Sequence, residues 1–446
     1  MKIERIEKFL IRNRERFGYI HFGMFILFLA LFLIPPFLPV PPEEAKPWNN
    51  FVLFAKFAVW GLWFPLIQAS VIIFGRAWCG FFCPQGALAE FLNKRGRDRA
   101  LPKWLRWEGT PMMSFIVITV LGQLVAVRDY PKPMLLIFGG TTVIAATIGY
   151  RYTKGRRAWC RHLCPVGLLL GIFSRLGMVG IERGERNGAR VVCPLYINLQ
   201  TKVASRHCIE CIKCVNPGTP GTLRINLRVP GKEIEEIRER DADVYEVSFL
   251  FLATGLALGG FHWLVNPFYV KFKTAIGSFL LDLGLGELIG KSGPWWVMVN
   301  SPESGDVFNW LDFISVSSFM LSAMAAIGCT LFILTLISSI SLRSEEERGN
   351  EGTVPGIMEK VSAIGYTYTP VALLSLILGL GAELFSLSHL VGLGDGTVKV
   401  IKLIILSVGV IWSLYLSYRL TNRQLLAQIP NIVGIGIVTW AWYLAI

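Results

Sequence analysis

Charged residues are scarce in this sequence, and no cleavable signal peptide is evident. Asp, Glu, Lys and Arg make up 17% of the 446 residues, whereas apolar and aromatic residues make up 53% and the mean hydropathy is +0.51. Soluble domains carry about 25% charged residues, so this composition excludes an ordinary soluble protein. The first apolar run, residues 18–40, is too long for a signal peptide and lacks a small-residue cleavage site. It predicts a permanent first transmembrane helix.

The apolar runs predict an all-α polytopic membrane protein of about nine transmembrane helices. They lie at residues 19–40, 51–74, 110–128, 134–150, 246–269, 310–340, 361–386, 399–420 and 430–446. Much of the net charge of +13 comes from basic residues before the first helix and after the second and fourth, as the positive-inside rule expects of cytoplasmic loops. This placement explains the charge without a nucleic-acid partner. It predicts an inner (cytoplasmic) membrane protein with a cytoplasmic N-terminus and an external C-terminus.

Apolar and polar segments divide the chain into three regions. Residues 1–181 hold two duplicated transmembrane hairpins, each ending in a Cys-x3-Cys-Pro motif. Residues 182–243 are polar and long enough for a small ferredoxin-like insert on the cytoplasmic side. Residues 244–446 return to the membrane for about five helices and carry no assignable motif.

The repeat of the cysteine motif is the most informative feature. Cys79 and Cys160 are 81 residues apart, as are Cys83 and Cys164. The matching flanks are Arg76, Ala77, Trp78, Pro84, Gly86 and Leu88 in the first copy and Arg157, Ala158, Trp159, Pro165, Gly167 and Leu169 in the second. Repeats with the same membrane orientation are related by an axis along the membrane normal. Such an axis would bring the two cysteine pairs face to face on the cytoplasmic side.

The spacing within each pair suits metal ligation. On one helix, residues i and i+4 share a face about 6 Å apart along the axis, so two thiolates can reach one cluster or share one metal. The proline after the second cysteine tends to open a new turn. A single pair could equally be two buried apolar cysteines, but two copies with matching flanks disfavour that interpretation.

The insert carries three further cysteines, Cys208, Cys211 and Cys214, in the spacing Cys-x2-Cys-x2-Cys. This is most of the bacterial ferredoxin run, and it predicts [4Fe–4S] ligation. The run lacks its fourth cysteine, for which Cys193, followed by a proline, has the expected form. We therefore assign these four to one cluster. His207, beside the run, is a candidate hydrogen-bond partner of a cluster sulfur.

The remaining grouped cysteines are assigned to a second [4Fe–4S] cluster: Cys79, Cys83, Cys160 and Cys164. Zinc is the rival, because four-cysteine zinc sites are tetrahedral and need no redox role. A mixed partition, in which each pair completes a different cluster, stays open. Cys329 lies in an apolar run and is expected to be core. Two clusters near one face predict an electron path, and the basic charge of the insert suits either an acidic redox partner or anionic lipid.

These motifs resemble those of the membrane-bound polyferredoxins of the NapH, NosR and CcoG type. The resemblance rests on GRAWCGFFCPQGAL, RRAWCRHLCPVGLL and CIECIKC, and it covers about residues 50–225. It implies an iron–sulfur electron-transfer subunit, often placed between quinols or cytosolic donors and a partner reductase or maturation reaction. Typical relatives carry two complete ferredoxin motifs, whereas this chain has one run that is short of a cysteine.

Histidine is scarce, with five residues in the chain. His262 and His389 fall near the outer ends of two C-terminal transmembrane helices, where a pair at one depth would suit a quinone or, less favourably, haem b. Two interfacial histidines beside turns are the simpler interpretation.

The sequence therefore predicts a membrane protein that passes electrons through two [4Fe–4S] clusters. Its partners would be a soluble or subunit redox protein docked on the cytoplasmic face and a membrane acceptor or donor, for which a quinone is the candidate. It would act as the electron-transfer subunit of an oxidoreductase. Two alternatives stay open: a maturation factor that supplies electrons to a client metalloenzyme, and a transporter with structural zinc.

Overall fold

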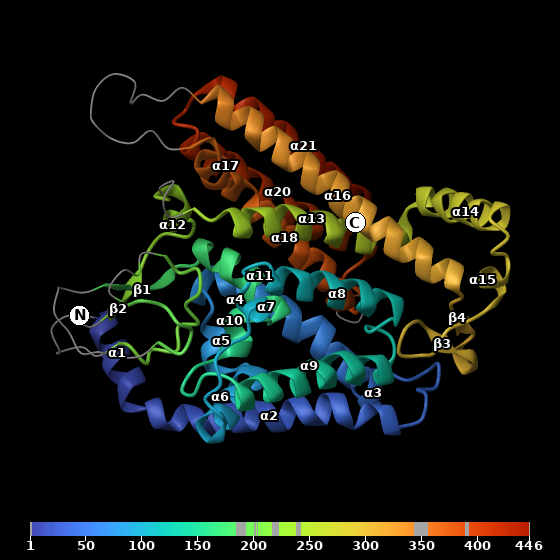
Figure 1. The fold of residues 1–446 in the computed structure, drawn as a ribbon, viewed down its shortest axis with the longest axis horizontal. Coiled ribbons are helices and arrows are strands. Elements are labelled where there is room, and N and C mark those ends of the chain that lie inside the picture. Colours follow the sequence, from blue (N-terminus) through green and yellow to red (C-terminus); the bar gives the residue numbers. More distant parts are fainter. Residues whose placement is uncertain are drawn as a thin grey trace. The chain divides into compact units, whose positions relative to one another are not determined.

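The computed structural model describes residues 2–183, 193–199, 202, 204–215, 223–237, 242–342, 356–388 and 392–445. Long helices dominate this part of the chain, and its strands are short (Figure 1), which confirms the all-α polytopic prediction. The chain divides into two compact units. Unit 1 comprises Met1–Phe37, Trp63–Phe115 and Phe138–Asp241, and unit 2 comprises Leu38–Leu62, Ile116–Ile137 and Ala242–Ile446. Each unit is described by itself.

Eight helical segments in the described residues are long and apolar enough to cross a bilayer. They are Arg14–Phe37, Phe51–Phe74, Pro131–Arg151, Val244–Val265, Trp310–Ser341, Ile357–Leu380, Asp395–Leu420 and Leu425–Ala445. The expected span at 110–128 forms only the 15-residue helix α8 (Thr110–Leu124). At 1.5 Å per residue, α8 is about 22 Å long, shorter than the ~30 Å hydrocarbon core. A turn ends it, in which Ala126 has a φ of 49° and Val127 N donates to Gly122 O at 2.9 Å.

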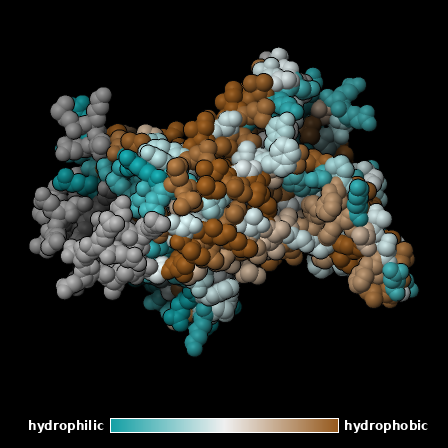
Figure 2. All heavy atoms as spheres, turned by 90° about the horizontal axis from the view of Figure 1, so that it is seen from above, coloured by the Kyte–Doolittle hydropathy of each residue, from teal (hydrophilic) through white to brown (hydrophobic). Residues whose placement is uncertain are grey.

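Large apolar side chains remain exposed along the spanning helices. The most apolar stretch of the segment Arg14–Phe37 has a mean hydropathy of 2.3, yet only 17% of that stretch is buried. Figure 2 shows hydrophobic residues over much of the visible face. Soluble proteins rarely expose contiguous apolar surface of this extent, so these faces suit contact with lipid.

Unit 1 contains both hairpin repeats and the insert. Its helices are α1 (Lys2–Arg12), α2 (Phe17–Leu33), α4 (Phe64–Phe74), α5 (Ala77–Phe81), α6 (Pro84–Arg95), α7 (Lys103–Arg106), the start of α8, the end of α9 (Pro131–Arg151), α10 (Ala158–His162), α11 (Pro165–Phe173) and α12 (Lys232–Glu235). Strands β1 (Val179–Arg183) and β2 (Leu223–Leu227) pair antiparallel, with Ile181 opposite Ile225.

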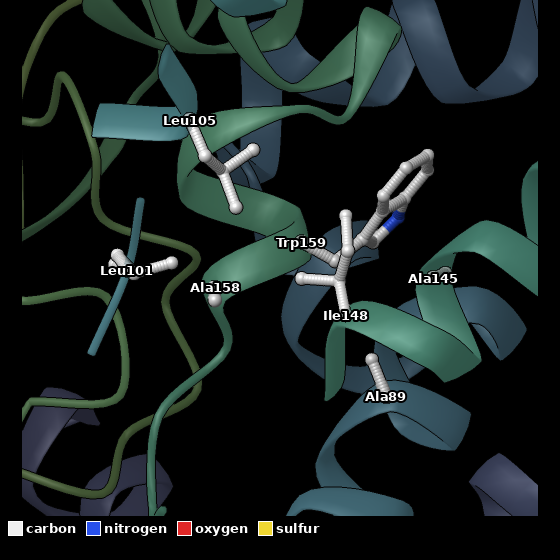
Figure 3. Packing of buried hydrophobic residues seen from close by; sticks show 7 residues of the cluster. All are labelled: Ala89, Leu101, Leu105, Ala145, Ile148, Ala158 and Trp159. Atoms are coloured by element: carbon white, nitrogen blue, oxygen red, sulfur yellow. The ribbon is translucent and has the colours of Figure 1, made fainter. Parts of the chain in front are cut away.

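A hydrophobic cluster around Trp159 holds the second cysteine motif in place (Figure 3). Its members are Ala89, Leu101, Leu105, Ala145, Ile148, Ala158 and Trp159. Trp159 is 1% exposed, and its ring lies beside Ile148. A Cβ on Gly149 would overlap the backbone of Ala89, so α6 and α9 approach as closely as glycine allows.

Asn93 at the end of α6 fixes the chain between α9 and α10. Its Nδ2 donates to the carbonyl oxygens of Gly149 and Tyr152 at 2.8 Å and of Thr153 at 2.9 Å. Its Oδ1 accepts from Arg156 N at 3.1 Å. These bonds set the position from which α10 begins.

Unit 2 is a helical bundle. Its elements are α3 (Phe51–Lys56), continued by a π-helix over Phe57–Trp63, α13 (Val244–Val265), α14 (Pro267–Asp282), α15 (Glu287–Gly290), β3 (Asn300–Ser301), β4 (Asp306–Val307), α16 (Trp310–Ser341), α17 (Ile357–Gly365), α18 (Thr369–Leu380), α19 (Ala382–Ser386), α20 (Asp395–Leu420) and α21 (Leu425–Ala445). Cβ atoms on Gly255 and Gly259 would lie 2.9 Å from α16, so this small-xxx-small pair lets α13 and α16 pack closely.

Candidate functional site

Four cysteines from the two repeats lie together in unit 1, and we call Cys79, Cys83, Cys160 and Cys164 the membrane-edge set. A Cβ on Gly86 would lie 3.3 Å from Cys160 Sγ and 3.6 Å from Cys83 Sγ. Burial raises the pKa of Cys164, and so do the nearby charges of Cys160, Cys83 and Cys79. The structure thus brings both pairs to one place.

The two cysteines of a motif do not share one continuous helix, so the expected i, i+4 geometry is wrong. Cys79 lies in α5, which ends at Phe81, and Cys83 is the N-cap of α6 with φ −65° and ψ 113°. Cys164 is the N-cap of α11 with φ −56° and ψ 118°. Each following proline occupies the first helical position, where its missing N–H costs nothing. The second cysteine of each motif therefore sits at a helix N-terminus, where the dipole favours a thiolate.

The arginine that precedes each motif reaches into the opposite repeat. Arg157 Nη1 donates to Cys79 O at 3.0 Å and would lie 3.4 Å from a Cβ on Gly86. Arg76 Nη2 would lie 3.6 Å from a Cβ on Gly167. Arg76 is 3% exposed and Arg157 2%. The repeated arginines and glycines therefore have a shared role: each glycine leaves room for the other repeat's arginine beside the sulfurs.

The four cysteines of the insert, Cys193, Cys208, Cys211 and Cys214, line a single cavity, and we call them the insert set. Lys202 and Lys213 line the same cavity. Glu210 and Ile212, which separate the cysteines of the run, have left-handed φ values of 52° and 51°. These unusual conformations for non-glycine residues turn the loop so that its three cysteines face one space.

The two sets are adjacent. A Cβ on Gly80, next to Cys79, would lie 3.1 Å from the backbone of Cys211. Arg157 N donates to Pro194 O at 2.7 Å, beside Cys193. The backbone of one set is therefore packed directly against that of the other.

A buried ionic group also joins the sets. Arg157 Nε donates to Glu90 Oε2 at 2.6 Å, and Lys213, between Cys211 and Cys214, donates to Glu90 Oε1. Burial opposes the charge of Glu90, but Arg157 and Lys213 lower its pKa to about 2. Glu90 is therefore an anion under physiological conditions, and it holds one cation from each side.

The N-terminal segment closes the insert, a role that the sequence analysis missed. Arg14 Nη2 donates to Ile212 O and to Val215 O, both at 2.9 Å. The buried carboxylate of Glu7 accepts from Ile225 N at 2.6 Å. Leu10, Ile11 and Phe17 pack on the apolar residues around Cys208. The mixture of charged and apolar residues in α1 is typical of an amphipathic helix. This pattern could have predicted that α1 packs against another part of the chain.

Without a bound metal, burial disfavours thiolates in both sets. Burial is the largest cause that raises the pKa of Cys83 to about 12 and of Cys160 to about 11, with further increases from neighbouring cysteines. Burial likewise raises the pKa of Cys208 and Cys214 to about 12. Metal ligation requires thiolates, so loading either set would release protons.

The predicted histidines have different environments. Burial lowers the pKa of His207, as do Arg161 and Arg206, and within the described residues its Nε2 has no hydrogen-bond partner. His262 uses both ring nitrogens: Nε2 bonds to Ala441 O at 2.9 Å and Nδ1 to Asn266 Nδ2 at 3.1 Å. His389 lies outside the described residues. The histidine pair expected for a quinone or haem therefore stays a prediction.

The comparisons with known proteins point to the two repeats. Residues 57–103 and 133–181 match the 4Fe-4S binding domain family. The chain is similar to the methylamine utilization ferredoxin-type protein MauN of Methylorubrum extorquens, with 33% identity over 138 residues, which are 28% of this chain and 47% of that protein.

Two proteins of Escherichia coli are also similar. The putative electron transport protein YccM is 31% identical over 148 residues, 27% of this chain and 42% of YccM. The ferredoxin-type protein NapH is 25% identical over 127 residues, 25% of this chain and 42% of NapH. The chain thus spans about half the length of these curated relatives or less. No solved structure matches.

Proposed function

We propose, from the premise that this chain carries the paired 4Fe-4S binding domain of the membrane-bound polyferredoxins, that it is a membrane electron-transfer protein with two [4Fe–4S] clusters. The observation that carries the proposal is the gathering of eight cysteines into two adjacent sets of four within unit 1. Four thiolates are the usual ligand set of such a cluster. A bound cluster would supply a one-electron redox centre.

The donor sets fit this group. Cys79, Cys83, Cys160 and Cys164 would hold one cluster, and Cys193, Cys208, Cys211 and Cys214 the other. The absent Cβ atoms of Gly86 and Gly167 leave space beside the sulfurs of the membrane-edge set. Buried arginines next to that set would balance the negative charge of bound thiolates.

The sequence context of the donors favours clusters over zinc. Cys208, Cys211 and Cys214 have the spacing of the bacterial ferredoxin run, and a proline follows Cys193. A four-cysteine zinc site is tetrahedral and needs neither feature.

The contact between the sets supports an electron path. We place both sets at the cytoplasmic side of an inner membrane, because the basic connections that carry the cysteine motifs suit the positive-inside rule. Electrons would pass between a soluble or subunit redox partner and a membrane acceptor or donor, with a quinone as the candidate. The regions 1–181, 182–243 and 244–446 would serve as paired hairpins, cluster-bearing insert and C-terminal membrane anchor.

The proposal is tested on the full-length chain, purified anaerobically and placed in nanodiscs. Dithionite should bleach the visible iron–sulfur absorbance, and an added quinone should restore it. Cys164→Ala should remove about half of the absorbance. Cys329, which was expected to be core, is exposed in the structure and lies outside both sets, so Cys329→Ala should leave the absorbance unchanged. Zinc in place of iron would contradict the electron-transfer function. Bleaching without any return by quinones would favour the maturation role over the quinone-linked one.

A further inference from the structure

The two repeated arginines differ in how their charges are balanced. Arg157 is paired with Glu90 in α6, with Arg157 Nη2 at 2.6 Å from the carboxylate oxygen Oε2. Glu90 lies seven residues after Cys83, and the equivalent position after Cys164 is Gly171. The second repeat therefore has no carboxylate where the first repeat has one.

Arg76 occupies the corresponding place in the second half of the site, where the described residues offer it no paired carboxylate. Its Nη1 donates to the carbonyl oxygen of Arg206 at 3.3 Å, and a Cβ on Gly171 would lie 3.5 Å from the same nitrogen. Within the residues that the structure describes, Arg76 forms no ion pair with a carboxylate, and its buried Nε–H has no hydrogen-bond acceptor. Glu210, whose carboxylate lies close to Gly75, is not paired with Arg76 either.

The guanidinium of Arg76 lies beside the membrane-edge set, because a Cβ on Gly167 would lie 3.6 Å from Arg76 Nη2 and 3.3 Å from Cys164 Cβ. Burial opposes its charge, but Cys79, Cys164 and Cys160 hold the pKa of Arg76 above its ordinary value. The charge of Arg76 is thus directed at the membrane-edge set. With 3% exposure, it is poorly screened by water or salt.

The cations near the insert set are less buried than Arg76. Arg14, which is half-buried, donates to Ile212 O and Val215 O on the cysteine loop. Lys213 is 38% exposed and shares Glu90 with Arg157. Lys202 lines the cavity and is only partly buried, with its ammonium group donating to Ile181 O. Solvent exposure and the shared carboxylate both reduce the positive potential that these lysines impose.

We propose that Arg76 gives the membrane-edge set the higher reduction potential of the two, which makes electron flow from the insert set to the membrane-edge set downhill. This inference rests on the proposed function, because it assumes a cluster at each set. An added electron increases the negative charge on a four-thiolate group, and a buried, unpaired guanidinium stabilises that charge. One electron leaves the insert set and one enters the membrane-edge set, with no bond made or broken.

The test is a redox titration of the full-length, anaerobically purified protein, followed by electron paramagnetic resonance. Cys214→Ala and Cys164→Ala, each missing one ligand, assign the two signals. In the wild type the membrane-edge signal should titrate at the higher potential. Arg76→Gln should lower that potential by at least ~59 mV, which is a tenfold change in the equilibrium constant of a one-electron reduction.

Two further variants test whether positive charge raises the potential of the membrane-edge set. Glu90→Gln leaves Arg157 unpaired, so it should raise the membrane-edge potential, opposite to Arg76→Gln. Arg76→Lys keeps the charge and should retain most of the wild-type potential. Lys94→Gln is the control, because Lys94 lies in the same helix as Glu90 but is exposed, and it should shift neither signal.

The outcomes separate this inference from the proposed function. Protein without iron would contradict the function itself. Protein with both signals, but with the insert set at the higher potential or with Arg76→Gln matching the Lys94→Gln control, would overturn the inference alone. Should Arg76→Gln not fold, an unchanged or lowered membrane-edge potential in Glu90→Gln would overturn it equally.

Discussion

Replacing Glu90 by glutamine removes the carboxylate that pairs Arg157 in one repeat with Lys213 in the insert. These cations lower the pKa of Glu90 from 4.5 to about 2, against the opposing effect of burial. At about 1.4 kcal/mol per pH unit, this corresponds to ~3 kcal/mol of stability. Breaking a buried ion pair typically costs about 3–5 kcal/mol, which agrees. The Glu90 side chain is only 19% exposed, so water screens this interaction little.

The loss is measurable as a lower midpoint of thermal unfolding in detergent, at equal iron content. For a domain of the size of unit 1, each kcal/mol shifts the midpoint by about 2–4 °C, so Glu90→Gln should lower it by ~6–12 °C. Glu108→Gln is the matched control, because Glu108 is 49% exposed and lies 3.5 Å from Arg206. Exposed pairs contribute at most about 1 kcal/mol.

The pH dependence gives an independent check. The folded-state pKa of Glu90 is depressed, so its contribution is fully present above the unfolded value of 4.5 and is lost as pH falls towards 2. The difference between wild type and Glu90→Gln should therefore be constant near neutral pH and shrink below pH 4.5. Equal shifts for Glu90→Gln and Glu108→Gln, or a difference that persists undiminished in acid, would refute this reasoning.

Three further changes probe packing and closure. Trp159→Ala should lower the free energy of unfolding by about 3–5 kcal/mol, because it leaves a cavity in the hydrophobic cluster that packs against the second motif. A decrease under about 1 kcal/mol in chemical unfolding would contradict this. Gly149→Ala should lower the thermal midpoint because its Cβ would overlap α6, whereas Gly140→Ala, with open space around it, should not; equal effects would refute the close approach. Arg14→Ala should speed iron loss from the insert set in air, since two bonds to the cysteine loop are removed, and the exposed Arg12→Ala should match wild type.

The covalent spacing of the cysteines predicted much of the candidate site. Two copies of one motif on equivalent hairpins must lie at similar depth, so the approach of Cys83 and Cys160 followed from the repeat. The membrane class followed from hydropathy, because an apolar helix long enough to cross a bilayer is rarely found in another environment. The short α8 was harder to foresee, since its end depends on the left-handed residue Ala126 and not on loss of apolar residues.

The charges around the sulfurs could not be predicted in the same way. In the sequence, Arg76 and Arg157 are recognisable only as charges that orient the membrane helices or as flanks of the cysteine motifs. That each arginine contacts the opposite repeat is seen only in the folded chain. Glu90 pairs with a residue 67 positions away and with another 123 positions away. The N-terminal segment likewise has its partners in the insert, about two hundred residues further along the chain. Such contacts depend on tertiary packing, which local sequence patterns do not specify.

Iron and acid-labile sulfide, counted per chain in the anaerobically purified full-length protein, test the central claim most directly. Two [4Fe–4S] clusters predict about eight irons and eight sulfides, falling to about four of each in either Cys164→Ala or Cys214→Ala. About four irons in the wild type would leave one set empty. One zinc ion per set with no sulfide would contradict the account.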